Sequence, residues 1–203
     1  MRAIDFYFDF SSPYGFIASL RIEEFAEKHG LTVNWRPFLL GFAMQQTGSK
    51  PAIDVPMKGD YLRHDLVRCA SENGVHFTMA PGFPFNSMPA VRAYYWLHNQ
   101  DPVKARSLAQ ALLRAAYVDE VSIVSPTDVA AIAQAELGIE SEAILAAVQD
   151  PEVKSMVKAV VTSAMEKKVF GSPFFIVDGE SFWGHDRLPQ MSEWLNRGGW
   201  PAV

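Results

Sequence analysis

Alternating apolar and polar positions mark both ends of the chain, and a long stretch with helical spacing separates them. Residues 3–8 alternate and are rich in β-forming side chains, which predicts a first strand. Residues 13–29 follow with amphipathic spacing, and Gly30 stands where such a helix would end. The apolar stripe of this helix consists of Ala18, Ile22, Phe25 and Ala26. Residues 31–35 predict a second strand, so the chain begins with a β-α-β unit whose strands run parallel.

The middle of the chain is predicted to be helical. Residues 41–59 contain two prolines and read as irregular, whereas residues 61–72 have a helical pattern with Cys69 on the apolar face. Residues 78–87 are expected to form a loop. Further helices are expected at about 88–99, 102–117, 126–137, 141–149 and 151–168. Three of them begin with a capping side chain before a proline, at Asp101-Pro102, Ser125-Pro126 and Asp150-Pro151.

The last part of the chain returns to β-structure. Residues 173–177 predict a strand, Asp178-Gly179 a hairpin turn and residues 181–183 its returning strand. Asp186 is expected to cap a final helix that ends near Leu195. We therefore predict an α/β protein with a thioredoxin-like fold and an inserted all-helical subdomain. The thioredoxin-like domain would comprise residues 1–40 and 169–203, and the insertion, with loops that cover the substrate, residues 41–168.

Composition narrows the class of protein. A net charge of −5 without a basic cluster disfavours nucleic acid as a partner. The single cysteine, Cys69, excludes an internal disulfide and a multi-cysteine metal site, and the scattered histidines indicate no metal site. The first residues lack a signal-peptide pattern, and no apolar run is long enough to span a membrane. These features favour a cytoplasmic protein without a membrane partner.

Two Ser-Pro pairs, far apart in the chain, are candidates for chemistry. Ser12 is expected to cap the helix that begins at Pro13, and such a helix start also favours a bound anion. On local sequence, capping alone is the favoured interpretation. Pro173 precedes a β run, which favours a trans proline at the start of an edge strand. About 5–6% of X-Pro bonds in folded proteins are cis. A cis bond at Ser172-Pro173 would instead expose the Ser172 backbone to an extended ligand.

A third candidate segment, Trp183-Gly184-His185-Asp186, lies before the final helix. In isolation, Asp186 reads as a helix cap and His185 as a surface histidine. A hydrolytic set of Ser12, His185 and Asp186 is disfavoured, because no GxSxG turn is present and the last two are sequence neighbours. Glycine-rich nucleotide-binding motifs are also missing from the sequence.

Taken together, the segments DFYFDFSSPYGF and VFGSPFFIVDGESFWGHDRL resemble one family along nearly the whole chain. This family contains the 2-hydroxychromene-2-carboxylate isomerases and the kappa-class glutathione transferases, which are relatives of the DsbA-type oxidoreductases. The resemblance implies a thioredoxin-like fold and glutathione as the cofactor. The redox motif Cys-Pro-x-Cys matches Ser12-Pro13-Tyr14-Gly15, so both redox cysteines are missing and thiol–disulfide exchange is not expected.

The resemblance assigns roles residue by residue. Ser12 would contact the sulfur of glutathione, with Ser11 as a rival, and would be the catalytic residue. Ser172 would precede a cis-proline, Pro173, and pair through its backbone with the cysteinyl part of glutathione. The segment gripping the γ-glutamyl end would be Trp183, Gly184, His185 and Asp186. Relatives often have Asn or Ser in place of His185.

The substrate end departs from the pattern of the isomerases. Met44, residues 52–54 and Phe85 before Asn86 stand where those relatives have a lysine, an Asn-Arg pair and a tyrosine. Recognition of an aromatic carboxylate is thereby weakened, and Arg63, Arg92 or Lys50 would have to supply the missing charge. Large apolar side chains of the loops indicate either an apolar lid or simple packing onto the sheet. These side chains are Phe42, Met44, Phe83 and Phe85.

We therefore expect a cytoplasmic, homodimeric, glutathione-dependent isomerase of aromatic compound catabolism. Its substrate would be a small hydrophobic or aromatic electrophile. A kappa-like glutathione transferase or peroxidase is the first alternative. A thioredoxin-fold binding module without catalysis is the second, and joint retention of Ser12, Ser172 and Asp186 argues against it.

Overall fold

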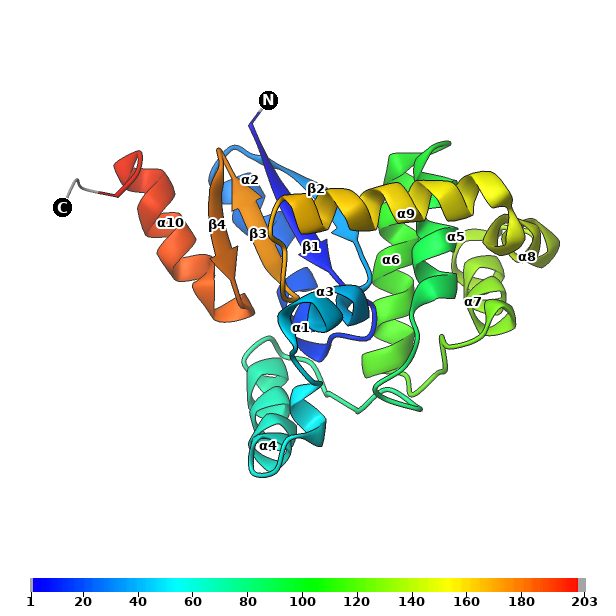
Figure 1. The fold of residues 1–203 in the computed structure, drawn as a ribbon, viewed down its shortest axis with the longest axis horizontal. Coiled ribbons are helices and arrows are strands. Elements are labelled where there is room, and N and C mark those ends of the chain that lie inside the picture. The colour runs from blue at the N-terminus through cyan, green and yellow to red at the C-terminus, as the bar shows by residue number, and fades with distance from the viewer. Residues whose placement is uncertain (1, 201–203) are drawn as a thin grey trace.

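A four-stranded mixed sheet forms the centre of the protein in the computed structural model, which describes residues 2–200 (Figure 1). The strands are β1 (Ala3–Phe8), β2 (Thr32–Pro37), β3 (Phe174–Val177) and β4 (Glu180–Trp183), in the order β2-β1-β3-β4. β1 runs parallel to β2 and antiparallel to β3, and β4 pairs antiparallel with β3. The predicted β-α-β unit and the C-terminal hairpin are thus confirmed.

The helix predicted over residues 13–29 is broken in two. Its halves are α1 (Pro13–Ser19) and α2 (Ile22–Lys28). At the break, the backbone N–H of Arg21 donates to the carbonyl of Ala18 at 3.1 Å, a tight turn that ends α1. The prediction of one continuous helix was therefore wrong. No glycine or proline marks the break, so the local sequence does not indicate it.

The prediction of an irregular segment over residues 41–59 was also partly wrong. This segment contains most of α3 (Leu40–Thr47) and a short 3-10 helix, η1 (Ala52–Asp54). A residue far away in the sequence stabilises the first turn of α3. Its Leu40 N–H donates to the buried carboxylate of Asp9, just after β1, at 2.7 Å. α4 (Lys58–Ser71) follows and buries Cys69, as predicted.

The remaining helices match the predicted positions closely. They are α5 (Met88–His98), α6 (Pro102–Tyr117), α7 (Pro126–Leu137), α8 (Ser141–Gln149) and α9 (Pro151–Glu166). The side chains of Asp101, Ser125 and Asp150 accept backbone N–H groups at the helix starts, which confirms the three predicted caps. Among the described residues, no helix has both the length and the apolar character needed to cross a bilayer.

The last elements differ from prediction in one detail. A short 3-10 helix, η2 (His185–Arg187), precedes α10 (Leu188–Arg197), and no side chain caps α10. Asp186 therefore lies within η2, one turn before α10, and the prediction that it caps the final helix was wrong.

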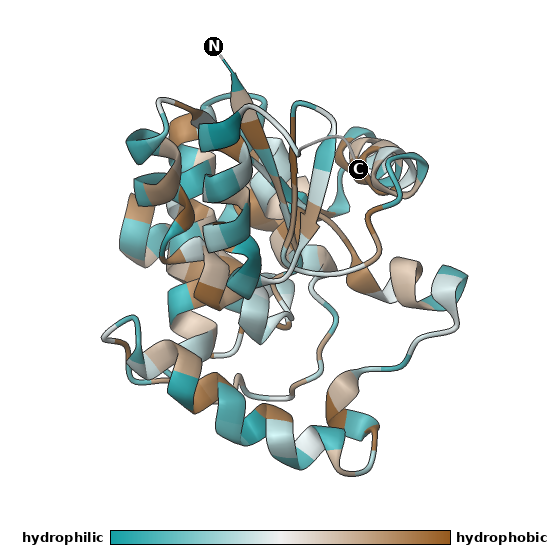
Figure 2. Cartoon of the chain, turned by 90° about the vertical axis from the view of Figure 1, so that its left-hand side faces the viewer, coloured by the Kyte–Doolittle hydropathy of each residue, from teal (hydrophilic) through white to brown (hydrophobic). Residues whose placement is uncertain are grey.

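A large buried cluster joins the sheet to the helices, and a smaller one packs β1 and β3 against α3 and α9. Buried side chains of β1 and β2 share a single cluster with those of α5, α6 and α7. In Figure 1, α5 to α8 gather beyond the β2 side of the sheet, whereas α10 lies beside β4. Figure 2 shows apolar segments along the central strands and mixed segments along the surrounding helices. The boundaries proposed between a thioredoxin-like domain and a helical insertion stay a prediction.

Three buried tyrosine hydroxyls tie the helices to the sheet. In α5, Tyr94 donates to the carbonyl of Trp35 and Tyr95 to that of Pro37, each at 2.9 Å. Tyr117 at the end of α6 donates to the carbonyl of Phe10 at 3.0 Å. These bonds satisfy carbonyl groups at the carboxyl ends of β1 and β2, where the chain turns into the candidate site.

Candidate functional site

Ser12 occupies the turn between β1 and α1 and is almost fully buried. Its hydroxyl oxygen accepts the N–H of Gly15 at 3.1 Å, so the predicted helix cap is confirmed. The same hydroxyl donates to the carbonyl of Ser172 at 3.0 Å. The two Ser-Pro pairs, 160 residues apart in the chain, are therefore in direct contact.

The Ser172-Pro173 peptide bond is cis, and it leads into β3, which lies between β1 and β4. The trans proline at an edge strand, which local sequence favours, is therefore wrong, and the cis bond implied by the resemblance is present. The Ser172 hydroxyl accepts the N–H of Asp9 at 3.0 Å. On the other side, the N–H of Gly184 donates to the carbonyl of Pro173 at 3.1 Å.

Gly15 permits the close contact between these two turns. A Cβ atom at Gly15 would lie 2.9 Å from the Ser172 hydroxyl oxygen and 3.2 Å from the Ser12 Cβ. Only a residue without a side chain fits here without displacing one of the two serines. The glycine that matches the second redox cysteine of the DsbA motif is thus required by its surroundings.

Asp9 is a central residue of this region that the sequence reasoning missed. Its carboxylate is 3% exposed and accepts hydrogen bonds from the Ser11 N–H at 2.8 Å, the Ser87 hydroxyl at 2.6 Å and the Leu40 N–H at 2.7 Å. Burial raises the pKa of Asp9 above its usual value, although the hydrogen bonds oppose the shift. An aspartate between Phe8 and Phe10, in an otherwise aromatic run, was the available signal.

The segment Trp183–Asp186 lies beside the cis-proline turn, at the end of β4. The exposed Trp183 indole packs on Phe170 with ring centroids 4.9 Å apart, and a Cβ at Gly171 would overlap it. Gly184 has a φ of 113°, a conformation that favours glycine. Asp186 is exposed, with its carboxylate 3.7 Å from the Arg187 guanidinium.

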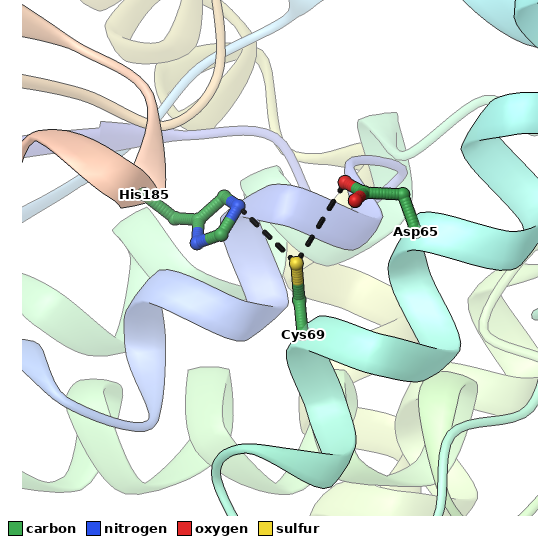
Figure 3. Close-up of side chains that lie close together, drawn as sticks. All are labelled: Asp65, Cys69 and His185. Carbon is green, nitrogen blue, oxygen red and sulfur yellow. Dashed lines mark hydrogen bonds between the residues drawn. The ribbon is translucent and has the colours of Figure 1, made fainter.

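The side chain of His185 points from η2 toward α1 and α4. Its ring stacks on that of Tyr14 with centroids 5.1 Å apart and planes 6° from parallel. Its Nε2 lies 3.7 Å from the Sγ of Cys69 (Figure 3). Tyr14 in turn donates its hydroxyl to Asp65 at 2.6 Å, so α4 is attached to the candidate turn through these side chains.

Burial sets the protonation of this group. It raises the pKa of Cys69 to about 11, with Asp65 adding to the effect, and it lowers the pKa of His185 below its usual value. Burial also raises the pKa of Tyr14, reinforced by the hydrogen bond to Asp65. At neutral pH Cys69 is thus a thiol rather than the thiolate that thiol–disulfide exchange requires.

The residues assigned to the substrate end do not form one cluster of contacts. Met44 is half-buried on α3, and Phe85 packs against the main core. Asn86 is exposed and accepts the N–H of Met88 at 3.0 Å, at the start of α5. Phe42, in contrast, is half exposed and lines a cavity. Packing onto the core thus describes Phe83 and Phe85, whereas the interpretation of the loops as a lid stays a prediction.

This cavity of about 770 Å³ lies between α3, α5 and α9. Its wall is apolar apart from a few polar and cationic side chains, and it includes Arg92, one of the predicted sources of compensating charge. The cations are Arg92, Lys154, Lys158 and Lys168. Neither Ser12 nor Ser172 lines it, so it is separate from the serine turn.

Comparisons with known proteins agree with this geometry. Residues 3–196 match the family described as DSBA-like thioredoxin domain. The 2-hydroxychromene-2-carboxylate isomerase of Sphingobium xenophagum is 27% identical over 199 residues, covering 96% of this chain and 98% of that protein. Glutathione S-transferase kappa 1 of Homo sapiens is 23% identical over 206 residues, covering 96% of this chain and 91% of that protein.

A solved structure of 2-hydroxychromene-2-carboxylate isomerase superposes with a TM-score of 0.86 at 25% identity, covering 96% of this chain and 95% of that one. The resemblance found in the two sequence segments is confirmed, and so is the predicted thioredoxin-like fold class. The similar proteins named here are an isomerase and a transferase, both enzymes. From the match over residues 3–196, the chain belongs to the DsbA-like thioredoxin family.

Proposed function

We propose that this protein is a glutathione-dependent isomerase of the 2-hydroxychromene-2-carboxylate isomerase type. The observation that carries the proposal is the contact between Ser12 and the Ser172 carbonyl at the cis-proline turn, at 3.0 Å. Ser12-Pro13-Tyr14-Gly15 matches the family's Cys-Pro-x-Cys motif, but serine and glycine stand in place of the two cysteines. A site of this kind needs a thiol brought by its ligand. The name of the relative glutathione S-transferase kappa 1 supports glutathione as that ligand.

Binding would free the Ser12 hydroxyl. In the proposed complex, the cysteinyl N–H of glutathione donates to the Ser172 carbonyl, which at present accepts the Ser12 proton. Competition for this carbonyl turns the Ser12 hydroxyl toward the ligand sulfur, where it donates to a thiolate. The exposed Asp186 carboxylate would hold the α-ammonium group, with Trp183, Gly184 and His185 completing the wall of the γ-glutamyl site.

The proposed reaction leaves glutathione unchanged. The thiol proton passes to solvent, and the thiolate forms a C–S bond to a conjugated substrate while the electron pair of the attacked double bond moves into the conjugated system. Rotation about the new single bond follows. Expulsion of the thiolate then breaks the C–S bond and restores the double bond in the other geometry. Ser12 forms no covalent bond, because it acts by stabilising the sulfur anion.

The isomerase names among the relatives support a substrate class. We propose a small hydrophobic or aromatic electrophile, with Met44, Phe85 and Asn86 at the substrate end. A homodimer in the cytoplasm remains our expectation for the enzyme.

The test is a titration of glutathione thiolate absorbance in the ultraviolet, with and without the protein. Free thiols of this type have a pKa of about 8.5, and we expect a lower value for bound glutathione. Ser12→Ala should raise the pKa of the bound thiol toward the free value. Ser11→Ala is the matched control, because it removes the neighbouring hydroxyl and should leave that pKa unchanged.

The outcomes separate the candidates. Failure of glutathione to bind refutes the enzyme proposal, and a shift that depends on Ser11 instead of Ser12 refutes the assigned donor. Binding with an unshifted thiol would favour a binding module. The kappa-transferase names among the relatives make conjugation the second candidate. Recovery of free glutathione after complete turnover distinguishes the isomerase, because a transferase leaves it attached to the product.

A further inference from the structure

Three side chains with metal-binding atoms meet where α4 faces η2. Asp65 and Cys69 are four residues apart on α4, so they lie on one face of the helix. His185 reaches the same point from η2, 116 residues later in the chain. Figure 3 shows the Cys69 Sγ between the other two, with the Asp65 Oδ2 and the His185 Nε2 each 3.7 Å away.

These separations fit the edges of a small coordination tetrahedron. Zinc binds thiolate sulfur at about 2.3 Å and nitrogen or oxygen at about 2.0–2.2 Å, so tetrahedral angles place the sulfur about 3.5–3.7 Å from each neighbouring ligand atom and the nitrogen about 3.4 Å from the oxygen. The two edges at Cys69, at 3.7 Å each, are close to this length. All three ligand atoms lie within 4.8 Å of one another, so closing the third edge needs a movement of at most about 1.4 Å.

The surroundings resemble the outer shell of a cation site. The Tyr14 hydroxyl donates to the Oδ2 of Asp65 at 2.6 Å, and the Tyr14 ring stacks on His185, so one residue orients two of the three ligands. The other carboxylate oxygen of Asp65 is bonded to Arg68. Asp186 and Glu72 add negative charge around His185. A thiolate, a carboxylate and a neutral imidazole carry two negative charges, which a divalent cation balances.

The chemistry of the set selects the class of ion. A thiolate and an imidazole favour borderline-soft ions such as Zn²⁺ over Mg²⁺ or Ca²⁺, which prefer oxygen ligands. Without a cation, Cys69 is a neutral thiol, since its pKa of about 11 lies far above neutral pH. A Cys–His ion pair of the kind found in nucleophilic cysteine sites is therefore disfavoured here.

We propose that Asp65, Cys69 and His185 bind a divalent zinc-like cation, with the fourth coordination position open. The Cys69 proton leaves to solvent as the metal–sulfur bond forms. The bound ion joins α4 to the turn that precedes α10. The metal site shares His185 with the wall of the proposed γ-glutamyl site, but its ligands include neither Ser12 nor Ser172, so it can be tested without glutathione.

Titration of the whole protein with Co²⁺ in the absence of glutathione tests the proposal. We expect one equivalent to produce a thiolate-to-cobalt charge-transfer band together with visible bands of a tetrahedral site, and Zn²⁺ to abolish both. Cys69→Ser should remove the charge-transfer band. Asp65→Asn and His185→Gln should each weaken Co²⁺ binding at least tenfold. His64→Gln is the matched control, since His64 is exposed on the same helix.

A thermal melt provides the second measurement. Zn²⁺ should raise the melting temperature of the unaltered protein and of His64→Gln, because binding to the folded state stabilises it, but not that of Cys69→Ser. The proposal is overturned if saturating Co²⁺ gives no charge-transfer band. It is equally overturned if the band survives in Cys69→Ser, or if His64→Gln weakens binding as much as His185→Gln.

Discussion

Replacement of Gly15 by alanine should destabilise the protein, although alanine is the better helix former. An alanine Cβ would lie 2.9 Å from the Ser172 hydroxyl oxygen, 3.2 Å from the Ser12 Cβ and 3.4 Å from the Asp9 carbonyl oxygen. The closest contact can be relieved only by rotating the Ser172 hydroxyl. That rotation breaks its hydrogen bond from the Asp9 N–H, now 3.0 Å long.

The magnitude follows from two opposing effects. A buried N–H left without a partner costs about 1–3 kcal/mol, whereas alanine in place of glycine within a helix gains up to about 1 kcal/mol. The net loss should be about 1–2 kcal/mol in the free energy of unfolding. With a slope of about 2 kcal/mol per molar urea, the unfolding midpoint should fall by about 0.5–1 M.

Urea unfolding followed by circular dichroism is the assay, and Gly41→Ala is the matched control. Gly41 lies in the first turn of α3, and a Cβ there would meet nothing within 4 Å, so its replacement should be stabilising. In a Ser172→Ala background the penalty at Gly15 should shrink by about 1 kcal/mol, because the obstructing hydroxyl is gone. A Gly15→Ala protein as stable as Gly41→Ala would refute the reasoning.

Three further substitutions probe stability elsewhere. Tyr95→Phe removes a buried hydrogen bond to Pro37 and should lower the free energy of unfolding by about 1–3 kcal/mol, measured in urea. Burial raises the pKa of Asp128, but hydrogen bonds from Ser122 and Ser125 outweigh it and hold that pKa below 3.8. Asp128→Asn should therefore cost about 1 kcal/mol above pH 3.8, a difference that disappears as the pH falls through the folded pKa. Burial and then Arg36 lower the pKa of His98 below 6.5, so the protein should lose stability as the pH falls below 6.5, and His98→Gln should reduce that loss in urea titrations at stepped pH.

Local signals account for the elements that were predicted correctly. Helices α6, α7 and α9 begin with Asp101, Ser125 and Asp150, and each of these side chains accepts a backbone N–H from within three residues. The start of α3 has no such local cap. Its Leu40 N–H is bonded to Asp9, 31 residues earlier, so a window of neighbouring residues contains no trace of it.

The candidate site also has parts that the sequence could predict and parts that it could not. Ser12 and Ser172 could be paired from the sequence only because two separated motifs resemble one family. The inward turn of His185 toward Tyr14 and Cys69 depends on how α4 packs against η2, and that packing has no counterpart in the residues flanking His185. Asp9 likewise forms hydrogen bonds to segments that only the folded chain brings together, including Ser87 and Ser172.

The tyrosine hydroxyls of α5 and α6 have a consequence for how such proteins can be recombined. Each of them donates to a carbonyl at least 58 residues away in the chain. The donor belongs to the helical segment and the acceptor to a strand or the turn after it, so a chimera that joins the two parts from different proteins changes one partner of each bond. Exchanging the helical segment between relatives should therefore cost about 1–3 kcal/mol for each of the three places where the incoming segment lacks a hydroxyl. The helices supply donors that carbonyl groups at the strand ends need, so the two parts are not interchangeable modules.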